Sequence, residues 1–258
     1  MKNRLDLVVS ERYKLTRTRA QTLIKDGKVM VEGIVITKPS FEVCEEVQIV
    51  VDMDNMYVSR GAYKLVGASE RFGLCFEGRV ALDMGASTGG FTQVLLQGGA
   101  TKVYAVDVGH GELDASLACD ERVVNMEGRD IRGLVGDELP GVDLVVGDLS
   151  FISLKNILPK INQLFGKIEC ILLFKPQFEC GKEIARKYRG VIKDKVIHKR
   201  LLREFLEELK IYGYEVCGLC HSPIKGKEGN IEYLLHLNAC KKLEFDVDKV
   251  VENAFKTI

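Results

Sequence analysis

The alternation of apolar and polar positions changes character near residue 55 of this chain. Upstream, two short apolar stripes predict two helices, of which the second begins after a capping Thr16 and closes at Gly27. The β-branched residues that follow, between positions 29 and 50, predict short strands. A small α+β unit is therefore expected at the N-terminus.

Downstream of residue 78, short apolar runs alternate with stretches of helical periodicity. The runs predict strands at 80–84, 103–108, 123–126, 142–146 and 169–174. The stretches between them predict helices near 91–98, 111–118 and 153–166. Strands that alternate with helices in this way form a parallel sheet covered by helices, so the fold class is α/β.

The last third of the chain predicts how this sheet ends. A long helix is expected near 196–211, and the apolar runs at 214–219 and 231–237 are expected to close the sheet as a hairpin-like pair, the last strand antiparallel. Residues 181–195 have no apolar period and are expected to form a long loop, whereas 243–256 predict a short terminal helix.

A polar break at 52–55 divides the two patterns. We expect one domain at 1–51, a linker at 52–58 and a second domain at 59–258.

Charge and hydropathy narrow the function classes. The 37 basic residues balance 37 acidic ones, which excludes a uniformly basic nucleic-acid coat, although residues 1–30 hold eight basic and three acidic residues. No run approaches the roughly 18 apolar residues that span a bilayer, and the first twenty residues have no apolar signal core. A soluble, cytoplasmic protein is expected.

The eight cysteines are scattered, so neither disulfides nor a metal site are expected. Cys217, Cys220 and His221 match the form of a haem-attachment or zinc motif, but no second CxxC or HxxxH motif supplies further ligands.

A glycine-rich turn follows the strand at 80–84, with Gly-x-x-x-Gly-Gly spacing that differs from the dinucleotide fingerprint and the P-loop. Glycines let the backbone approach a ligand, and the next helix offers free N–H groups. Asp107 ends the following strand, where a carboxylate can accept ribose hydroxyls. The predicted cofactor-binding residues are Asp83, Gly85, Ser87, Gly89, Gly90, Phe91, Asp107, Asp130 and Asp148. An ordinary βα turn with incidental acids is the alternative.

Four isolated charges, Lys64, Asp148, Lys175 and Glu232, are the candidate catalytic residues. Asp148 and Lys175 end apolar strands, and Glu232 begins the last one, which is expected to run the other way. Such positions meet at the ligand crevice of a doubly wound sheet. The alternative is a pair of structural ion pairs, Lys64–Glu232 and Asp148–Lys175.

These motifs resemble known families. The acid before the glycine turn resembles motif I of S-adenosylmethionine (SAM) methyltransferases, in which Asp130 would contact the adenine amino group. The Lys-Asp-Lys-Glu set resembles FtsJ-type RNA ribose 2′-O-methyltransferases, and residues 4–39 resemble the S4 RNA-binding domain. The chain is thus identified as a member of the TlyA (haemolysin A) family over residues 1–240.

The resemblance implies SAM-dependent 2′-O-methylation of cytidine in ribosomal RNA within ribosomal subunits. Lys175 would either deprotonate the ribose hydroxyl or orient it. The residues expected to bind RNA, among them two from the basic loop at 181–195, are Arg4, Arg17, Arg19, Lys28, Arg60, Lys187 and Arg189. A non-catalytic ribosome assembly factor and a membrane-lytic haemolysin are the alternatives.

Overall fold

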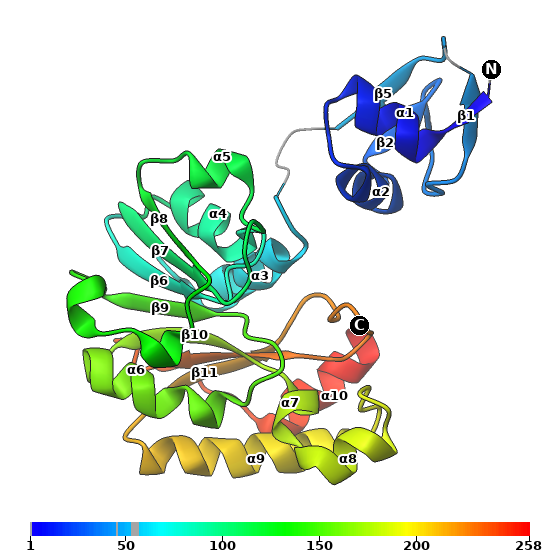
Figure 1. Ribbon diagram of the computed structural model, residues 1–258. Coiled ribbons are helices and arrows are strands. Elements are labelled where there is room, and N and C mark those ends of the chain that lie inside the picture. Colours follow the sequence, from blue (N-terminus) through cyan, green and yellow to red (C-terminus); the bar gives the residue numbers. More distant parts are fainter. Residues whose placement is uncertain (1, 45, 53–56) are drawn as a thin grey trace. The chain divides into compact units, whose positions relative to one another are not determined.

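The computed structural model describes residues 2–44, 46–52 and 57–258 and divides into two compact units, 1–56 and 57–258 (Figure 1). Each unit has its own apolar core. Of the linker predicted at 52–58, residues 53–56 lie outside the described residues.

The first unit packs two helices on two small antiparallel sheets, of strand order β1-β4 and β3-β2-β5. Its elements are β1 (Lys2–Arg4), α1 (Leu5–Arg12), α2 (Arg17–Lys25), β2 (Val29–Val31), β3 (Ile34–Val35), β4 (Glu42–Cys44) and β5 (Ile49–Val51). Thr16 caps α2 as predicted, because its hydroxyl accepts a hydrogen bond from the Arg19 N–H at 3.3 Å. The initial strand β1 was not predicted, since three residues carry no visible period.

Residues 57–258 build a seven-stranded sheet of order β11-β12-β10-β9-β6-β7-β8. Its strands are β6 (Val80–Met84), β7 (Lys102–Asp107), β8 (Val123–Glu127), β9 (Leu144–Gly147), β10 (Glu169–Phe174), β11 (Val216–His221) and β12 (Tyr233–Leu237). The last strand, β12, is antiparallel to both of its neighbours, and β6 to β10 are mutually parallel. The predicted α/β class and antiparallel last strand are confirmed.

Helices cover both faces of this sheet (Figure 1). One layer holds α3 (Gly61–Phe72), α4 (Gly90–Gln97) and α5 (Ala115–Ala118), and the other holds α6 (Leu158–Phe165), α9 (Lys195–Ile211) and α10 (Val247–Thr257). Side chains alternate between the layers along each strand, so that Ala81 packs with the first layer and Leu82 with the second. Short helices complete the unit: η1 (Ile131–Gly133), η2 (Gly136–Glu138), η3 (Leu154–Asn156), α7 (Pro176–Glu179) and α8 (Gly181–Lys187).

Several helices differ from the sequence-based prediction, and α8 and α3 are the two longest that it missed. The first, α8, occupies part of the predicted loop at 181–195. Its apolar period is too short to recognise, and Ile184 and Ala185 pack against the core. The second, α3, was not predicted, although Ala62, Leu65 and Ala68 have helical spacing and are fully buried.

Strand order places the ligand crevice. The chain leaves β6 toward β7 on one side and returns to β9 on its other side, so the carboxyl ends of β6 and β9 flank a topological switch point. Among the described residues, no helix is both long and apolar enough to cross a membrane.

Candidate active site

The turn between β6 and α4 forms a cradle that requires glycine. Gly85 and Gly89 have φ of +78° and +92°. A Cβ on Gly85 would lie 3.0 Å from the Asp148 carbonyl oxygen, and a Cβ on Gly89 would lie 2.3 Å from Leu117 Cδ1. The backbone of this turn is therefore closely packed on both sides, and larger residues would displace it.

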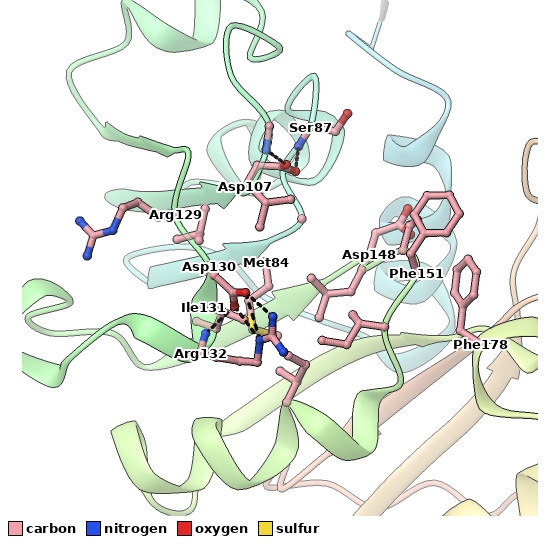
Figure 2. A pocket seen from close by; sticks show the side chains of 18 of the residues that line it. Met84, Ser87, Asp107, Arg129, Asp130, Ile131, Arg132, Asp148, Phe151 and Phe178 are labelled. Carbon is pink, nitrogen blue, oxygen red and sulfur yellow. Dashed lines mark hydrogen bonds and ion pairs between the residues drawn. The ribbon is translucent and has the colours of Figure 1, made fainter. Parts of the chain in front are cut away.

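Two acidic side chains lie at the ends of the neighbouring strands (Figure 2). Asp107 Oδ2 accepts a hydrogen bond from the Ser87 N–H, and Oδ1 accepts one from the Gly109 N–H, both at 2.8 Å. Asp130 pairs with the Arg132 guanidinium at 2.5 Å, and this contact holds the pKa of Asp130 below its usual value. Asp107 therefore keeps further lone pairs for a ligand, whereas both oxygens of Asp130 already accept hydrogen bonds from Arg132.

A cavity of about 1020 Å³ opens beside these residues. Of the predicted cofactor-binding residues, those that line it are Gly85, Ser87, Asp107, Asp130 and Asp148. Those outside its lining are Asp83, Gly89, Gly90 and Phe91. In Figure 2 the side chains of Asp107, Asp130 and Asp148 come from three different strand ends around this cavity.

Asp83 lies beneath the cradle and is fully buried. The Thr92 hydroxyl donates to its Oδ2 at 2.7 Å, whereas Oδ1 has no hydrogen-bond partner among the described residues. Burial disfavours the charged form and raises the pKa of Asp83 to about 7. Its position indicates support of the turn from below.

The four predicted catalytic side chains lie together at the carboxyl edge of the sheet. Lys64 Nζ is 2.9 Å from Asp148 Oδ2 and 2.9 Å from Glu232 Oε2. Lys175 Nζ is 2.7 Å from Asp148 Oδ1 and 2.8 Å from the Ser150 hydroxyl oxygen. The two ion pairs weighed from the sequence are both present, and the Lys64–Asp148 contact joins them into one chain of alternating charge.

Lys64, Lys175 and Glu232 are buried, and Asp148 also lines the cavity. Burial acts to lower the pKa of Lys64, but Asp148 and Glu232 together raise it above its usual value. Burial acts to raise the pKa of Asp148, but the two lysines lower it. Two ammonium groups and two carboxylates thus compensate one another, which buried charges require.

Aromatic side chains at the cavity were missed by the sequence analysis. Phe151 is 92 % exposed with φ of +63°, and its ring centroid lies 5.3 Å from that of Phe178 (Figure 2). Lys175 Nζ lies 5.7 Å from the Phe178 ring centroid. One indication of this site was visible in the sequence, namely that the apolar Phe151 directly follows polar residues at the end of a strand.

The predicted RNA-binding residues lie on both units, outside the cavity lining. Arg4 and Arg17 both contact the fully buried Asp6, at 2.9 and 3.1 Å, and the hydrogen bond from Arg4 holds the pKa of Asp6 well below its usual range. Lys28 pairs with Asp52. The three candidates on the second unit, Arg60, Lys187 and Arg189, are all exposed, and Arg19 on the first unit is half-buried.

Cys217 and Cys220 are buried in β11. No group of three His, Cys, Asp or Glu side chains in the described part of the chain is arranged to hold a metal ion.

Comparison with known proteins adds to this geometry. Residues 57–239 match the family model described as FtsJ-like methyltransferase, and residues 3–49 match the S4 domain. The 16S/23S rRNA (cytidine-2′-O)-methyltransferase TlyA of Mycobacterium tuberculosis is 43% identical, over 86% of this chain and 84% of its own length. Hemolysin A of Brachyspira hyodysenteriae is 41% identical, over 90% of this chain and 98% of its own length.

A solved structure agrees over nearly the whole chain. A Streptococcus thermophilus protein described as a hemolysin has a TM-score of 0.75 and 35% identity, and the match covers 99% of this chain and 96% of that one. A SAM-dependent methyltransferase from Listeria monocytogenes, at 15% identity and a TM-score of 0.51, shares the fold of the second unit.

Proposed function

Because this chain belongs to the FtsJ-like methyltransferase family, and within it to the TlyA/hemolysin A proteins, we propose that it methylates the 2′-hydroxyl of a cytidine ribose in ribosomal RNA, with SAM as the methyl donor. The observation that carries the proposal is the Glu232–Lys64–Asp148–Lys175 chain, buried at the carboxyl edge of the sheet beside the cavity.

The residues of the cavity fit SAM. Carboxylates in the lining can accept hydrogen bonds from the polar groups of this cofactor. Asp107 would accept hydrogen bonds from the ribose hydroxyls, and Asp130 would accept one from the adenine amino group. Asp148 lines the same cavity and belongs to the catalytic chain. The cradle of Gly85 and Ser87 brings backbone close to the ligand. A volume of about 1020 Å³ is at the upper end of the range for small-molecule sites, which leaves room for a nucleotide beside the cofactor. When bound, SAM supplies an electrophilic methyl group.

The catalytic chain then holds the acceptor hydroxyl. The Lys175 ammonium donates to Asp148 and Ser150, and an ammonium has three N–H groups, so one remains for the ribose oxygen. A donor at that oxygen directs a lone pair of the hydroxyl toward the methyl group, and such positioning supplies much of the rate. Lys64 fixes Asp148 from its other side. Lys175 cannot turn away without breaking its contacts with Asp148 and Ser150.

RNA binding involves both units in this proposal. The S4 unit would bind folded RNA through Arg4, Arg17, Arg19 and Lys28, since neutralising phosphates releases counterions. Arg60 would bind phosphates next to the target nucleotide. So would residues 181–195, here called the α8 segment, through Lys187 and Arg189. The substrate would be a ribosomal subunit in the cytoplasm.

The test is transfer of tritium from labelled SAM to purified ribosomal subunits, with nuclease mapping of the product. We expect label on one ribose, resistant to alkaline cleavage, and at least a hundredfold loss of rate in Lys175→Ala. Lys167→Ala is the matched control, because Lys167 is an exposed lysine just before the start of β10, whereas Lys175 follows its end.

Calorimetry with SAM checks that each variant still binds the cofactor. Wild-type protein that binds SAM but labels neither subunit would contradict the proposal and favour a non-catalytic assembly factor. Normal transfer by a folded Lys175→Ala would refute the role of Lys175. The lytic alternative predicts liposome leakage at physiological salt, and we expect none.

A further inference from the structure

The segment that follows α8 is fastened to the residues that lead into β12. Asn230 is 4 % exposed, and both ends of its carboxamide are hydrogen-bonded to that segment. Its Oδ1 accepts from the Ile192 N–H at 3.2 Å, and its Nδ2 donates to the Gly190 carbonyl at 2.8 Å. These contacts join positions about 40 residues apart in the sequence.

A second set of hydrogen bonds joins the same segment to Tyr233, the residue after Glu232, through the ring of His198. His198 on α9 is fully buried, with Nε2 3.0 Å from the Ile192 carbonyl and Nδ1 2.8 Å from the Tyr233 hydroxyl. Burial lowers the pKa of His198, so the ring is neutral and can donate to Ile192 while it accepts from Tyr233. Both backbone polar groups of Ile192 are therefore satisfied by side chains.

Glu232 lies between these two contacts. It is 2 % exposed, pairs with Lys64, and its carbonyl accepts a hydrogen bond from the Ser222 N–H at 2.9 Å. Through Lys64 its charge reaches Asp148 and hence Lys175. A shift of the backbone at position 230 would thus move Glu232 and, through the ion pairs, the side chains of Lys64, Asp148 and Lys175.

We infer that Asn230 is a positioning residue: it keeps the backbone of the basic α8 segment and the Glu232–Lys64 ion pair in fixed register, so that RNA held by that segment presents its ribose to Lys175. This inference rests on the proposed function. Lys187 and Arg189 lie within three residues of Gly190. RNA phosphates bound by these two side chains would therefore be held by the same stretch of backbone to which Asn230 is hydrogen-bonded.

The reason for an asparagine is chemical. The groups that it meets are the buried N–H of Ile192 and the carbonyl of the exposed Gly190, and a carboxamide is the side chain that accepts from one and donates to the other. Alanine would leave the buried Ile192 N–H without this partner and would release the Gly190 carbonyl. Aspartate keeps the shape but cannot donate to the Gly190 carbonyl.

The experiment compares Asn230→Ala and Asn230→Asp with Asn238→Gly in the full-length protein. Asn238 is the matched control because it follows the other end of β12, accepts from the Glu215 N–H at 2.9 Å and donates to the Ile168 carbonyl at 3.0 Å. Its φ of +53° suits glycine. Each variant is assayed for kcat on ribosomal subunits, for SAM and RNA affinity, and for thermal unfolding.

We expect kcat to fall at least tenfold in both Asn230 variants, with the Kd for SAM and for RNA within threefold of wild type. Asn238→Gly should lose thermal stability and keep kcat within twofold. A merely structural role would give no such separation of turnover from binding.

The inference is overturned if a folded Asn230 variant keeps wild-type kcat, or if Asn238→Gly loses as much turnover. If Asn230→Ala does not fold, the isosteric Asn230→Asp decides between these outcomes. Failure of the proposed function is distinct, because then the wild-type protein itself transfers no methyl group.

Discussion

Single charges decide the chemistry at the residue scale. Asp148 pairs with two lysines, one through each carboxylate oxygen. Buried ion pairs add little net stability, but removal of one partner leaves uncompensated charge. The cluster is thus expected to depend strongly on each of its members.

Asp148→Asn should therefore abolish methyl transfer and lower the free energy of unfolding by about 3–5 kcal/mol, the usual cost of breaking a buried ion pair. Denaturant unfolding and the tritium assay measure the two effects. Asp143→Asn, before the start of the same strand β9, removes a half-exposed carboxylate and should cost less than about 1 kcal/mol. Equal losses in the two variants would contradict the proposed network.

The buried Asp83 is expected to make the stability of the protein depend on pH. Because its folded pKa of about 7 exceeds the ordinary aspartate pKa of 3.8, the folded state binds the proton more tightly than the unfolded state. Its contribution to stability is full below pH 4 and is lost as pH rises toward about 7. The loss is at most about 4 kcal/mol for roughly three pKa units.

Asp83→Asn should remove this dependence, so the unfolding free energy of the variant should fall less than that of wild type between pH 5 and pH 8. Urea unfolding at both values checks it. An unchanged pH dependence would mean that Asp83 is not the group responsible.

At the element scale, the glycine turn between β6 and α4 is the part of the proposed cofactor site that tolerates the least change. Gly78 and Gly89 both have φ in the left-handed region, but a Cβ would meet nothing within 4 Å at Gly78, whereas at Gly89 it would meet Leu117 at 2.3 Å and Leu113 at 2.8 Å. A substitution at Gly78 therefore tests backbone strain alone, whereas one at Gly89 adds a steric clash.

Gly89→Ala should weaken SAM binding at least tenfold, because either the turn or the buried Leu113 and Leu117 side chains must shift, while Gly78→Ala should cost about 1 kcal/mol of stability and leave SAM affinity unchanged. Isothermal calorimetry measures the affinities. Comparable SAM affinities in both variants would show that the turn tolerates displacement.

Two separate cores characterise the whole molecule. The apolar cluster of residues 1–56 and those of residues 57–258 share no members, so a surface change on the first unit should not alter the cavity of the second. RNA affinity and cofactor affinity should therefore vary independently.

The double variant Arg17→Ala and Arg19→Ala should reduce the salt dependence of RNA binding by about two units of slope, since each cation that contacts a phosphate releases about one counterion. SAM affinity should stay at the wild-type value. Lys210→Ala, an exposed cation on α9, is the control and should keep the full slope. A full slope in the double variant would place these arginines outside the RNA interface.

The sequence by itself determined the order and type of most strands and helices of the second unit. Local periodicity and glycine punctuation encode these features, so β6 to β10 and α9 agree with the prediction to within two residues. It also determined that Asp148 and Lys175 follow strand ends, because an isolated charge after a buried run is visible in the chain itself.

Only the tertiary structure decided that the two ion pairs join into one chain through the Lys64–Asp148 contact. Insertion of β12 between β10 and β11 brings Glu232 to the Lys64–Asp148 contact, and that contact joins residues 84 positions apart. Helix α8 and the contacts of Asn230 likewise depend on long-range packing. Such pairings are fixed by strand register and by the cost of burying unpaired polar groups, and neither is written in local sequence.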